Sequence, residues 1–295
     1  MSCSVHASGS PAVQCRLITP ADIGAVADLL KKGFGSQRSH RFWLRMLERL
    51  GKYATPAEMP KYGYLLEHAG RPVGVLLLIS SIVNTGTARS IRCNGSGWYV
   101  EPEFRPYGSL LASCAMHRKA VTYVNISPAP HTWPILEAQG YRRYANGLFM
   151  SVPWLSAAPL GPVEVVAADA KLGISVDRFE QNLLTAHADF GCISVWCSTE
   201  AGAYPFVFVR RLVWRFVACF QLVYCRDIAD FARFARPLGR HLALRGRPLV
   251  LLDANGPVPG LVGRYFDAVR PKYFKGPNPP RLGDLSYTEA SLFGI

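Results

Sequence analysis

The sequence predicts an α/β protein made of two tandem domains. Its 295 residues suffice for two domains of ordinary size. Hydrophobic residues make up 49% and charged residues 18%, as in a globular protein. Strand patterns alternate with amphipathic helix patterns, and the order of the first half returns weakly in the second. We therefore expect a flexible tail over 1–14, a domain over 15–150, a linker over 151–162 and a degenerate second domain over 163–295.

The first half opens with a strand over 15–19. Thr19-Pro20-Ala21-Asp22 supplies a cap, a proline and an acid, so a helix is expected to run from here to about Phe34. A second amphipathic helix spans 42–50, where apolar residues recur at spacings of three and four. The later elements are strands over 62–67, 72–82, 90–100 and 121–126, a helix over 133–139 and a strand from Tyr141.

The second half follows the same order after a segment with three prolines, 151–162. The predicted helices are 177–190 and a basic helix over 228–244. The predicted strands are 163–167, 193–196, 206–209, 216–225 and 249–253. The two halves also end alike, since 144–149 and 287–293 both begin with Tyr and end with Leu-Phe.

The most informative stretch is 97–119, which reads as strand, basic turn and helix. Trp98, Tyr99 and Val100 favour a strand, and Pro102 ends it because proline has no N–H for the ladder. A short turn, Arg105-Pro106-Tyr107-Gly108-Ser109, precedes the helix. Such a turn can direct backbone N–H groups and an arginine toward one point, which suits a phosphate or pyrophosphate. The alternative is a structural turn without a ligand.

Val100-x-Pro102-x-x-Arg105-x-x-Gly108 resembles the central motif of the GNAT acyltransferase superfamily. The family pattern is Arg/Gln-x-x-Gly-x-Gly/Ala, and here Leu110 replaces the last small residue while Pro106 replaces a frequent glycine. Leu136-x-x-x-Gly140-Tyr141 is similar to the end of the family's last helix.

The resemblance implies two GNAT-like domains, each with a mixed, mostly antiparallel sheet flanked by helices. It also implies a site for acetyl-CoA or another acyl-CoA. Trp98, Tyr99 and Val100 would lie along the pantetheine arm. The turn residues Arg105, Pro106, Tyr107, Gly108 and Ser109 would hold the pyrophosphate. Asn125 would bond the pantetheine amides or only satisfy a neighbouring loop.

The resemblance predicts an N-acyltransferase that moves the acyl group of a CoA thioester to an amine. Many family members carry a tyrosine four residues before the glycine that ends the last helix, but Leu136 stands there. The remaining candidates for proton transfer are Tyr99, Ser127 and His131, although Tyr99 could be a packing residue and His131 a helix cap. The alternative is a catalytically silent acyl-CoA-binding or partner-binding protein.

The predicted second domain lacks a counterpart of the turn at 105–109. Only Arg226-Asp227 separates the strand ending at Cys225 from the next helix, and the carboxylates of Asp227 and Asp230 would repel a pyrophosphate. Only the first domain is therefore expected to bind CoA.

The net charge, the cysteines and the search for targeting segments predict the partners and the location of the protein. The formal net charge is +13, with 17 Lys and Arg against 8 Asp and Glu in 1–150 and 16 against 12 in 151–295, which suits a polyanionic cofactor or a nucleic acid. The basic residues follow no nucleic-acid-binding motif, so we expect a small-molecule or protein amine acceptor and no nucleic-acid partner.

Eight scattered cysteines without a C-x-x-C pair predict reduced thiols, a cytoplasmic protein and no metal site. No signal peptide and no apolar run of membrane-spanning length are evident, so we expect no membrane partner. A homodimer is left open.

Overall fold

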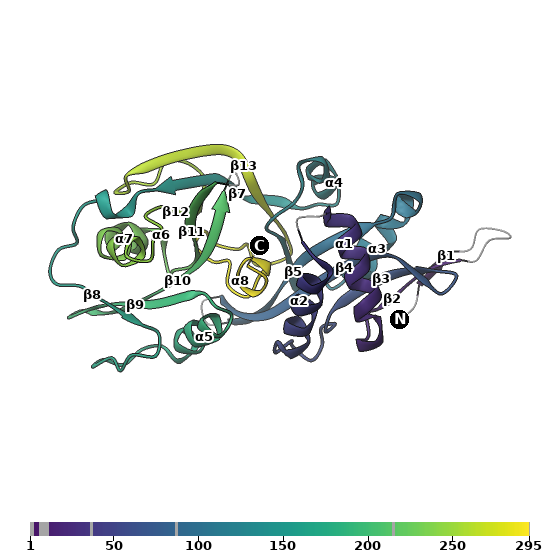
Figure 1. Ribbon diagram of the computed structural model, residues 1–295, viewed down its shortest axis with the longest axis horizontal. Coiled ribbons are helices and arrows are strands. Elements are labelled where there is room, and N and C mark those ends of the chain that lie inside the picture. The colour runs from purple at the N-terminus through teal and green to yellow at the C-terminus, as the bar shows by residue number, and fades with distance from the viewer. Residues whose placement is uncertain (1–2, 6–11, 36–37, 86–87, 214–215, 295) are drawn as a thin grey trace. The chain divides into compact units, whose positions relative to one another are not determined.

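The computed structural model describes residues 3–5, 12–35, 38–85, 88–213 and 216–294 (Figure 1). By its internal contacts the chain divides into two units. Unit 1 comprises Met1–Asn125 and Lys275–Pro279, and unit 2 comprises Ile126–Phe274 and Pro280–Ile295.

Unit 1 holds a sheet in the order β1-β2-β3-β4-β5-β6. Neighbouring strands are antiparallel except β5 and β6, which are parallel and joined through α3. The elements are β1 (Cys3–Val5), β2 (Val13–Leu17), η1 (Pro20–Asp22), α1 (Ile23–Phe34), α2 (His40–Lys52), β3 (Gly63–His68), β4 (Arg71–Thr85), β5 (Ala88–Val100), η3 (Pro102–Tyr107), α3 (Gly108–Ala115) and β6 (Val121–Asn125).

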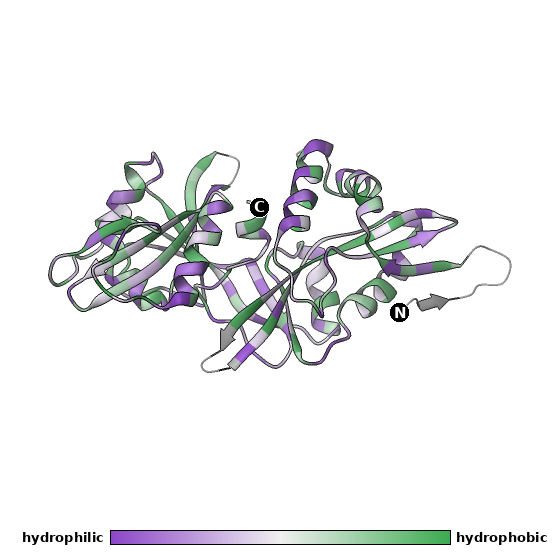
Figure 2. Ribbon diagram, turned by 90° about the horizontal axis from the view of Figure 1, so that it is seen from below, coloured by the Kyte–Doolittle hydropathy of each residue, from purple (hydrophilic) through white to green (hydrophobic). Residues whose placement is uncertain are grey.

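The helices of unit 1 follow their sequence signals. Ser39 caps α2 by accepting the Phe42 N–H at 3.1 Å, and the buried face of α2 is Trp43, Met46, Leu47 and Leu50. In α1 the buried residues are Val26, Ala27, Leu29 and Leu30, whereas Phe34, expected on the apolar face, is 41% exposed. Hydrophobic residues run along the central strands in Figure 2, and hydrophilic residues colour much of the helices.

The prediction of a flexible tail over 1–14 is wrong for the part that the structure describes. Residues 3–5 form β1, which pairs with β2 so that Ser4 lies opposite Gln14. The other residues of that prediction, 1–2 and 6–11, lie outside the described residues.

Unit 2 holds a sheet in the order β13-β7-β12-β11-β10-β9-β8. Only β11 and β12 are parallel, and α6 and α7 connect them. The elements are η4 (Pro130–Thr132), α4 (Trp133–Ala138), β7 (Arg142–Ser151), η5 (Pro153–Leu155), β8 (Glu164–Ala167), α5 (Arg178–Asp189), β9 (Ile193–Thr199), β10 (Gly202–Val213), β11 (Val217–Tyr224), α6 (Ile228–Arg233), α7 (Ala235–Ala243), β12 (Val250–Ala254), β13 (Gly263–Lys275) and α8 (Glu289–Leu292). The predicted fold class is thus confirmed, since each unit has a mixed, mostly antiparallel sheet with helices.

Three details of the second half differ from the prediction. The helix predicted over 228–244 is two helices, because the chain leaves helical geometry at Phe234. β13 was not predicted, since a bulge and Pro271 interrupt its alternation. The likeness of 287–293 to 144–149 is not structural, because 144–149 lies in β7 and 287–293 contains α8.

Each unit takes a segment from the other half of the sequence. β7, predicted to close the first domain, pairs with β12 and β13 in unit 2. Conversely, 275–279 belongs to unit 1, where the Asn278 N–H donates to Thr122 Oγ1 at 3.1 Å on β6. The contact division thus falls between Asn125 and Ile126, a different place from the predicted domains 15–150 and 163–295.

The 151–162 segment, predicted to be a linker, is packed against α7. Pro153 is buried, and a Cβ at Gly239 would lie 2.3 Å from the backbone nitrogen of Trp154. Glycine at 239 is therefore required for this close approach.

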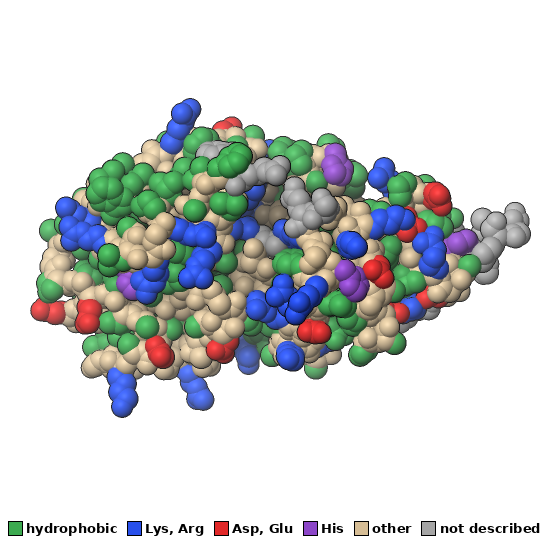
Figure 3. All heavy atoms as spheres, in the orientation of Figure 1, with side chains coloured by type: hydrophobic (Ala, Val, Ile, Leu, Met, Phe, Trp, Pro, Cys, Tyr) green, Lys and Arg blue, Asp and Glu red, His purple; other side chains and the backbone are tan. Residues whose placement is uncertain are grey.

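Among the residues that the structure describes, no helix is long and apolar enough to cross a membrane. Lys and Arg side chains are scattered over the face shown in Figure 3 and form no single stripe there.

Candidate functional site

Strands β5 and β6 of unit 1 separate partway along their length. They pair from Ile91 and Val121 as far as Asn94 and Val124, where Asn94 Nδ2 donates to the Val124 carbonyl at 3.3 Å. The paired register of β5 with β6 ends there, while 95–100 continue β5 beside β4. Backbone groups on that side of β5 can therefore bind an extended ligand as a further strand would.

A bulge shapes this part of β5. The register with β4 shifts between Val75 and Leu77, and Gly97 has φ +58°, a conformation that favours glycine. A Cβ at Gly97 would also lie 3.0 Å from a methyl carbon of Leu30 in α1.

The two aromatic residues of β5 face opposite sides of the sheet. The ring of Tyr99 lies against α1, since a Cβ at Gly33 would be 2.3 Å from Tyr99 Cγ. Trp98 faces α3, where a Cβ at Gly108 would be 4.0 Å from its ring. The strand prediction for 98–100 is confirmed, and Val100, which pairs with Gly74, is almost fully buried.

The basic turn is more ordered than the sequence suggests. Residues 102–107 form the 3₁₀ helix η3, in which the Phe104 N–H donates to the Glu101 carbonyl at 2.9 Å. The Gly108 N–H donates to the Arg105 carbonyl. The N–H of Gly108 is therefore used within the turn itself.

The turn nevertheless exposes a basic side chain close to the start of α3. Arg105, Pro106 and Ser109 are exposed, while Tyr107 and Gly108 are half-buried. Tyr107 is the N-cap residue of α3 and provides no side-chain cap, so the helix N-terminus keeps its affinity for negative charge.

A buried carboxylate fixes the end of β5 just before the turn. Glu101 forms ion pairs with Lys32 at 2.8 Å and with Arg71 at 2.9 Å. Burial alone would raise the pKa of Glu101, but the two cations outweigh burial and hold the pKa below its usual value. The sequence analysis missed this cluster because its members come from α1, β4 and the end of β5, and no local spacing relates them.

Unit 2 has a different turn at the corresponding point. Asp227 caps α6 by accepting the Ala229 N–H at 2.8 Å, which places a carboxylate where a phosphate would otherwise bind. Arg226 is held by Glu180 through two contacts of 2.7 and 2.6 Å. The turn of unit 2 therefore offers neither a free helix N-terminus nor an unpaired arginine.

Solved structures show which fold this arrangement belongs to. A GCN5-related N-acetyltransferase from Anabaena variabilis matches with a TM-score of 0.59 and 9% identity, covering 89% of this chain and 72% of that one. A GCN5-related N-acetyltransferase from Kribbella flavida matches at 0.56 with 15% identity, covering 91% and 72%. A putative acetyltransferase from Pyrococcus horikoshii matches at 0.54 with 13% identity, covering 96% and 95%.

The chain has the GNAT fold. No protein-family model and no curated protein sequence matches it.

The residues predicted to act in proton transfer are divided between the two units of this GNAT fold. Tyr99 belongs to unit 1, whereas Ser127 and His131 belong to unit 2. Ser127 donates to the buried carboxylate of Glu289, and His131 is exposed in η4. Asn125, the last residue of β6, is half-buried.

Leu136, at the position where many GNAT enzymes carry tyrosine, is 1% exposed in unit 2. A side chain so buried serves packing and offers no proton. Within the part of the chain that the structure describes, no three His, Cys, Asp or Glu side chains gather as metal ligands would.

Proposed function

We propose that unit 1 binds an acyl-CoA and transfers its acyl group to the amine of a small molecule or a protein. The observation that carries this proposal is the separation of β5 from β6 directly before an exposed basic turn and a helix N-terminus. The pantetheine arm would lie along residues 95–100, and the pyrophosphate would bind Arg105 and the start of α3.

The reaction needs few protein groups. The amine nitrogen attacks the thioester carbonyl, the C–S bond breaks, and the amine proton passes to a base while the thiolate gains a proton. Backbone N–H groups near Tyr99 and Val100 would stabilise the oxyanion. Tyr99 is the candidate within unit 1 for proton transfer, and its ring lies on the α1 side of the sheet.

Calorimetric titration with acetyl-CoA tests the binding step. Arg105→Ala removes a charge-assisted phosphate contact, so binding should weaken by about 1.5–3 kcal/mol. Arg41→Ala is the matched control, because Arg41 is an exposed arginine on α2 of the same unit. Equal affinities of the two variants would exclude the pyrophosphate site.

Leucine at 136 favours a second candidate function, a silent acyl-CoA-binding protein, because its side chain has no hydroxyl to transfer a proton. Release of free thiol from acetyl-CoA in the presence of an amine panel separates the two functions. If His131 is the base, His131→Ala should lower kcat by about 10²-fold or more and leave acetyl-CoA affinity unchanged. Full turnover of this variant would show that His131 has a structural role and is not the base.

The setting proposed for this activity is the cytoplasm. Cys93, Cys197 and Cys225 are buried reduced thiols, and burial raises the pKa of each, as expected for small apolar residues in a reducing compartment. A polyanionic cofactor accounts for the excess of basic residues in the first half without a nucleic-acid partner, and a homodimer remains open to measurement.

A further inference from the structure

Strand β13 of unit 2 contains a wide bulge. Asp267 pairs with Gly147 and Lys272 pairs with Ala145, so residues 268–271 all lie opposite Asn146. Two residues of the bulge have left-handed backbone conformations, Ala268 at φ +54° and Arg270 at φ +52°. Such conformations are strained in residues other than glycine, and strained residues of this kind cluster at ligand sites.

The bulge forms one wall of an apolar cavity. The cavity is partly open to solvent and measures about 110 Å³. Six of its lining side chains are apolar and come from four strands: Leu148, Met150, Val213, Leu251, Phe266 and Val269. An apolar lining of this kind can hold a small hydrocarbon group.

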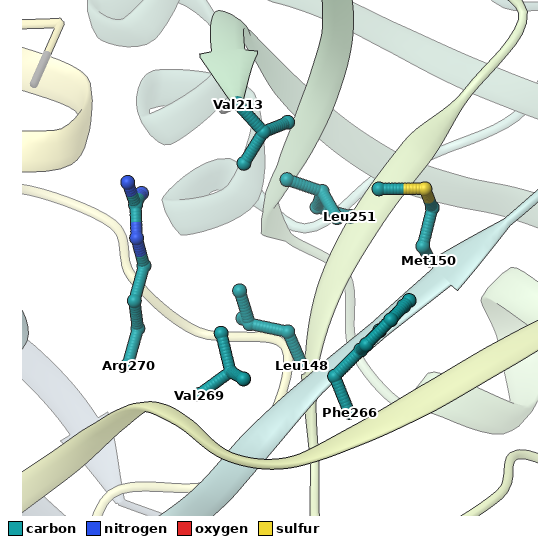
Figure 4. Close-up of a pocket in the computed structure, with 7 residues that line it drawn as sticks. All are labelled: Leu148, Met150, Val213, Leu251, Phe266, Val269 and Arg270. Carbon is teal, nitrogen blue, oxygen red and sulfur yellow. The ribbon is translucent and has the colours of Figure 1, made fainter. Parts of the chain in front are cut away.

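Among the described residues that line the cavity, Arg270 carries a charge and the others are apolar. In Figure 4 its side chain extends along one side of the apolar group, with the guanidinium at the far end. Arg270 is exposed, and no described carboxylate lies within ion-pair distance of it. The nearby buried pair Lys272–Asp253, with N–O distance 2.6 Å, is neutral overall.

Other cations reinforce the positive potential beside the cavity. Cys219 packs with two lining residues, Val213 and Leu251, in a buried cluster. Burial raises the pKa of its thiol, while the guanidinium groups of Arg211, Arg247 and Arg270 act in the opposite direction. The guanidinium groups of three arginines from separate segments therefore all favour negative charge at Cys219, beside the cavity.

We propose that this cavity binds a carboxylate with a short apolar tail of about five to seven carbons. The tail fills the space between the four strands, and the carboxylate pairs with Arg270. Guanidinium and carboxylate groups match geometrically, and a cavity with one polar group at its edge is the usual form of a small-ligand site. The cavity lies within unit 2, so the proposal does not depend on CoA binding by unit 1.

Calorimetry and thermal unfolding of the full chain with four probes test this proposal. Hexanoate should bind and raise the Tm, whereas acetate lacks the tail, hexan-1-ol lacks the charge and hexylamine has the opposite charge. Binding of hexan-1-ol as tight as that of hexanoate would show a plain apolar void and overturn the proposal, as would no binding of hexanoate.

Three variants locate the site. Arg270→Gln should weaken hexanoate binding about tenfold or more, while Arg210→Gln, an exposed arginine of β10, should leave it unchanged. Arg270→Gly should relieve the backbone strain, raise the Tm of the free protein and still abolish the hexanoate effect. This last variant separates loss of binding from loss of folding. Equal hexanoate affinity in Arg270→Gln and Arg210→Gln would overturn the proposal.

Discussion

At the scale of single residues, the position of the Tyr99 ring depends on the lack of a side chain at Gly33. The ring of Tyr99 lies over the backbone of α1, at a distance that leaves no room for a methyl group. The position of Tyr99, and with it the course of β5 beside the proposed thioester site, therefore depends on a glycine in the last turn of α1.

Gly33→Ala should destabilise the protein by about 1–3 kcal/mol, because the new Cβ would overlap the Tyr99 ring. Gly24→Ala in the same helix is the control, since nothing lies within 4 Å of its Cβ, and it should stabilise by about 0.5–1 kcal/mol. Urea unfolding of both variants measures the difference. Two variants of equal stability would contradict the close packing of Tyr99 on α1.

At the scale of elements, a cluster of charges joins β2, η1 and β3. Arg16 contacts both oxygens of Asp22 at 2.8 Å and also reaches Glu67 at 2.6 Å. The hydrogen bonds from Arg16 hold the pKa of Asp22 well below its usual value, against the opposing effect of burial.

This cluster predicts a loss of stability in acid. A carboxyl group with a lowered pKa in the folded state stabilises the fold above its unfolded pKa, and this contribution is lost as the pH falls, between about pH 5 and pH 2. The free energy of unfolding should therefore decrease as the pH falls over that range. In the Asp22→Asn variant this decrease with pH should be less steep. Parallel pH profiles for the two proteins would show that Asp22 does not contribute.

Elements with local signals could be predicted from the sequence. The apolar stripe of α2 is an example, and the strand and helix within 97–119 were predicted, although α3 begins at Gly108 and ends at Ala115, before Arg118 and Lys119. The break between α6 and α7 also had a signal, because Pro237 cannot donate to the carbonyl of Arg233 and so favours a new helix start.

Other features had no local signal. Four residues in the bulge of β13 shift its alternation, so its pattern does not read as a strand. The ion pairs of Glu101 and the bond from Ser127 to Glu289 join residues far apart in the sequence. Contacts of this kind follow from the tertiary fold and leave no local pattern in the sequence.

At the scale of the whole molecule, the exchange of segments between the sequence halves is the main departure from two independent domains. β7 precedes most of unit 2 in the chain yet pairs with β12, and 275–279 returns to β6. Neither half of the sequence contains every segment of one unit.

This exchange predicts that fragments 1–157 and 158–295 do not fold alone. The first lacks the segment that bonds to Thr122, and the second lacks the β7 partner of β12. Each fragment should show no cooperative thermal unfolding, whereas co-expression should yield a 1:1 complex with a cooperative transition. Size-exclusion chromatography and circular dichroism measure both outcomes. A stable, cooperatively unfolding fragment 1–157 would instead support an independent first domain.

Because 275–279 belongs to unit 1, it also determines when each unit can finish folding during synthesis. Because a ribosome adds residues from the N-terminus, the partner segment of β6 begins 150 residues after Asn125 (275 − 125) and is made after most of unit 2. Neither unit can therefore be completed before residue 275 has been added. A chain that stops early would be left with unpaired strand edges, which are targets for aggregation and proteolysis, and would leave no working half-protein in the cell.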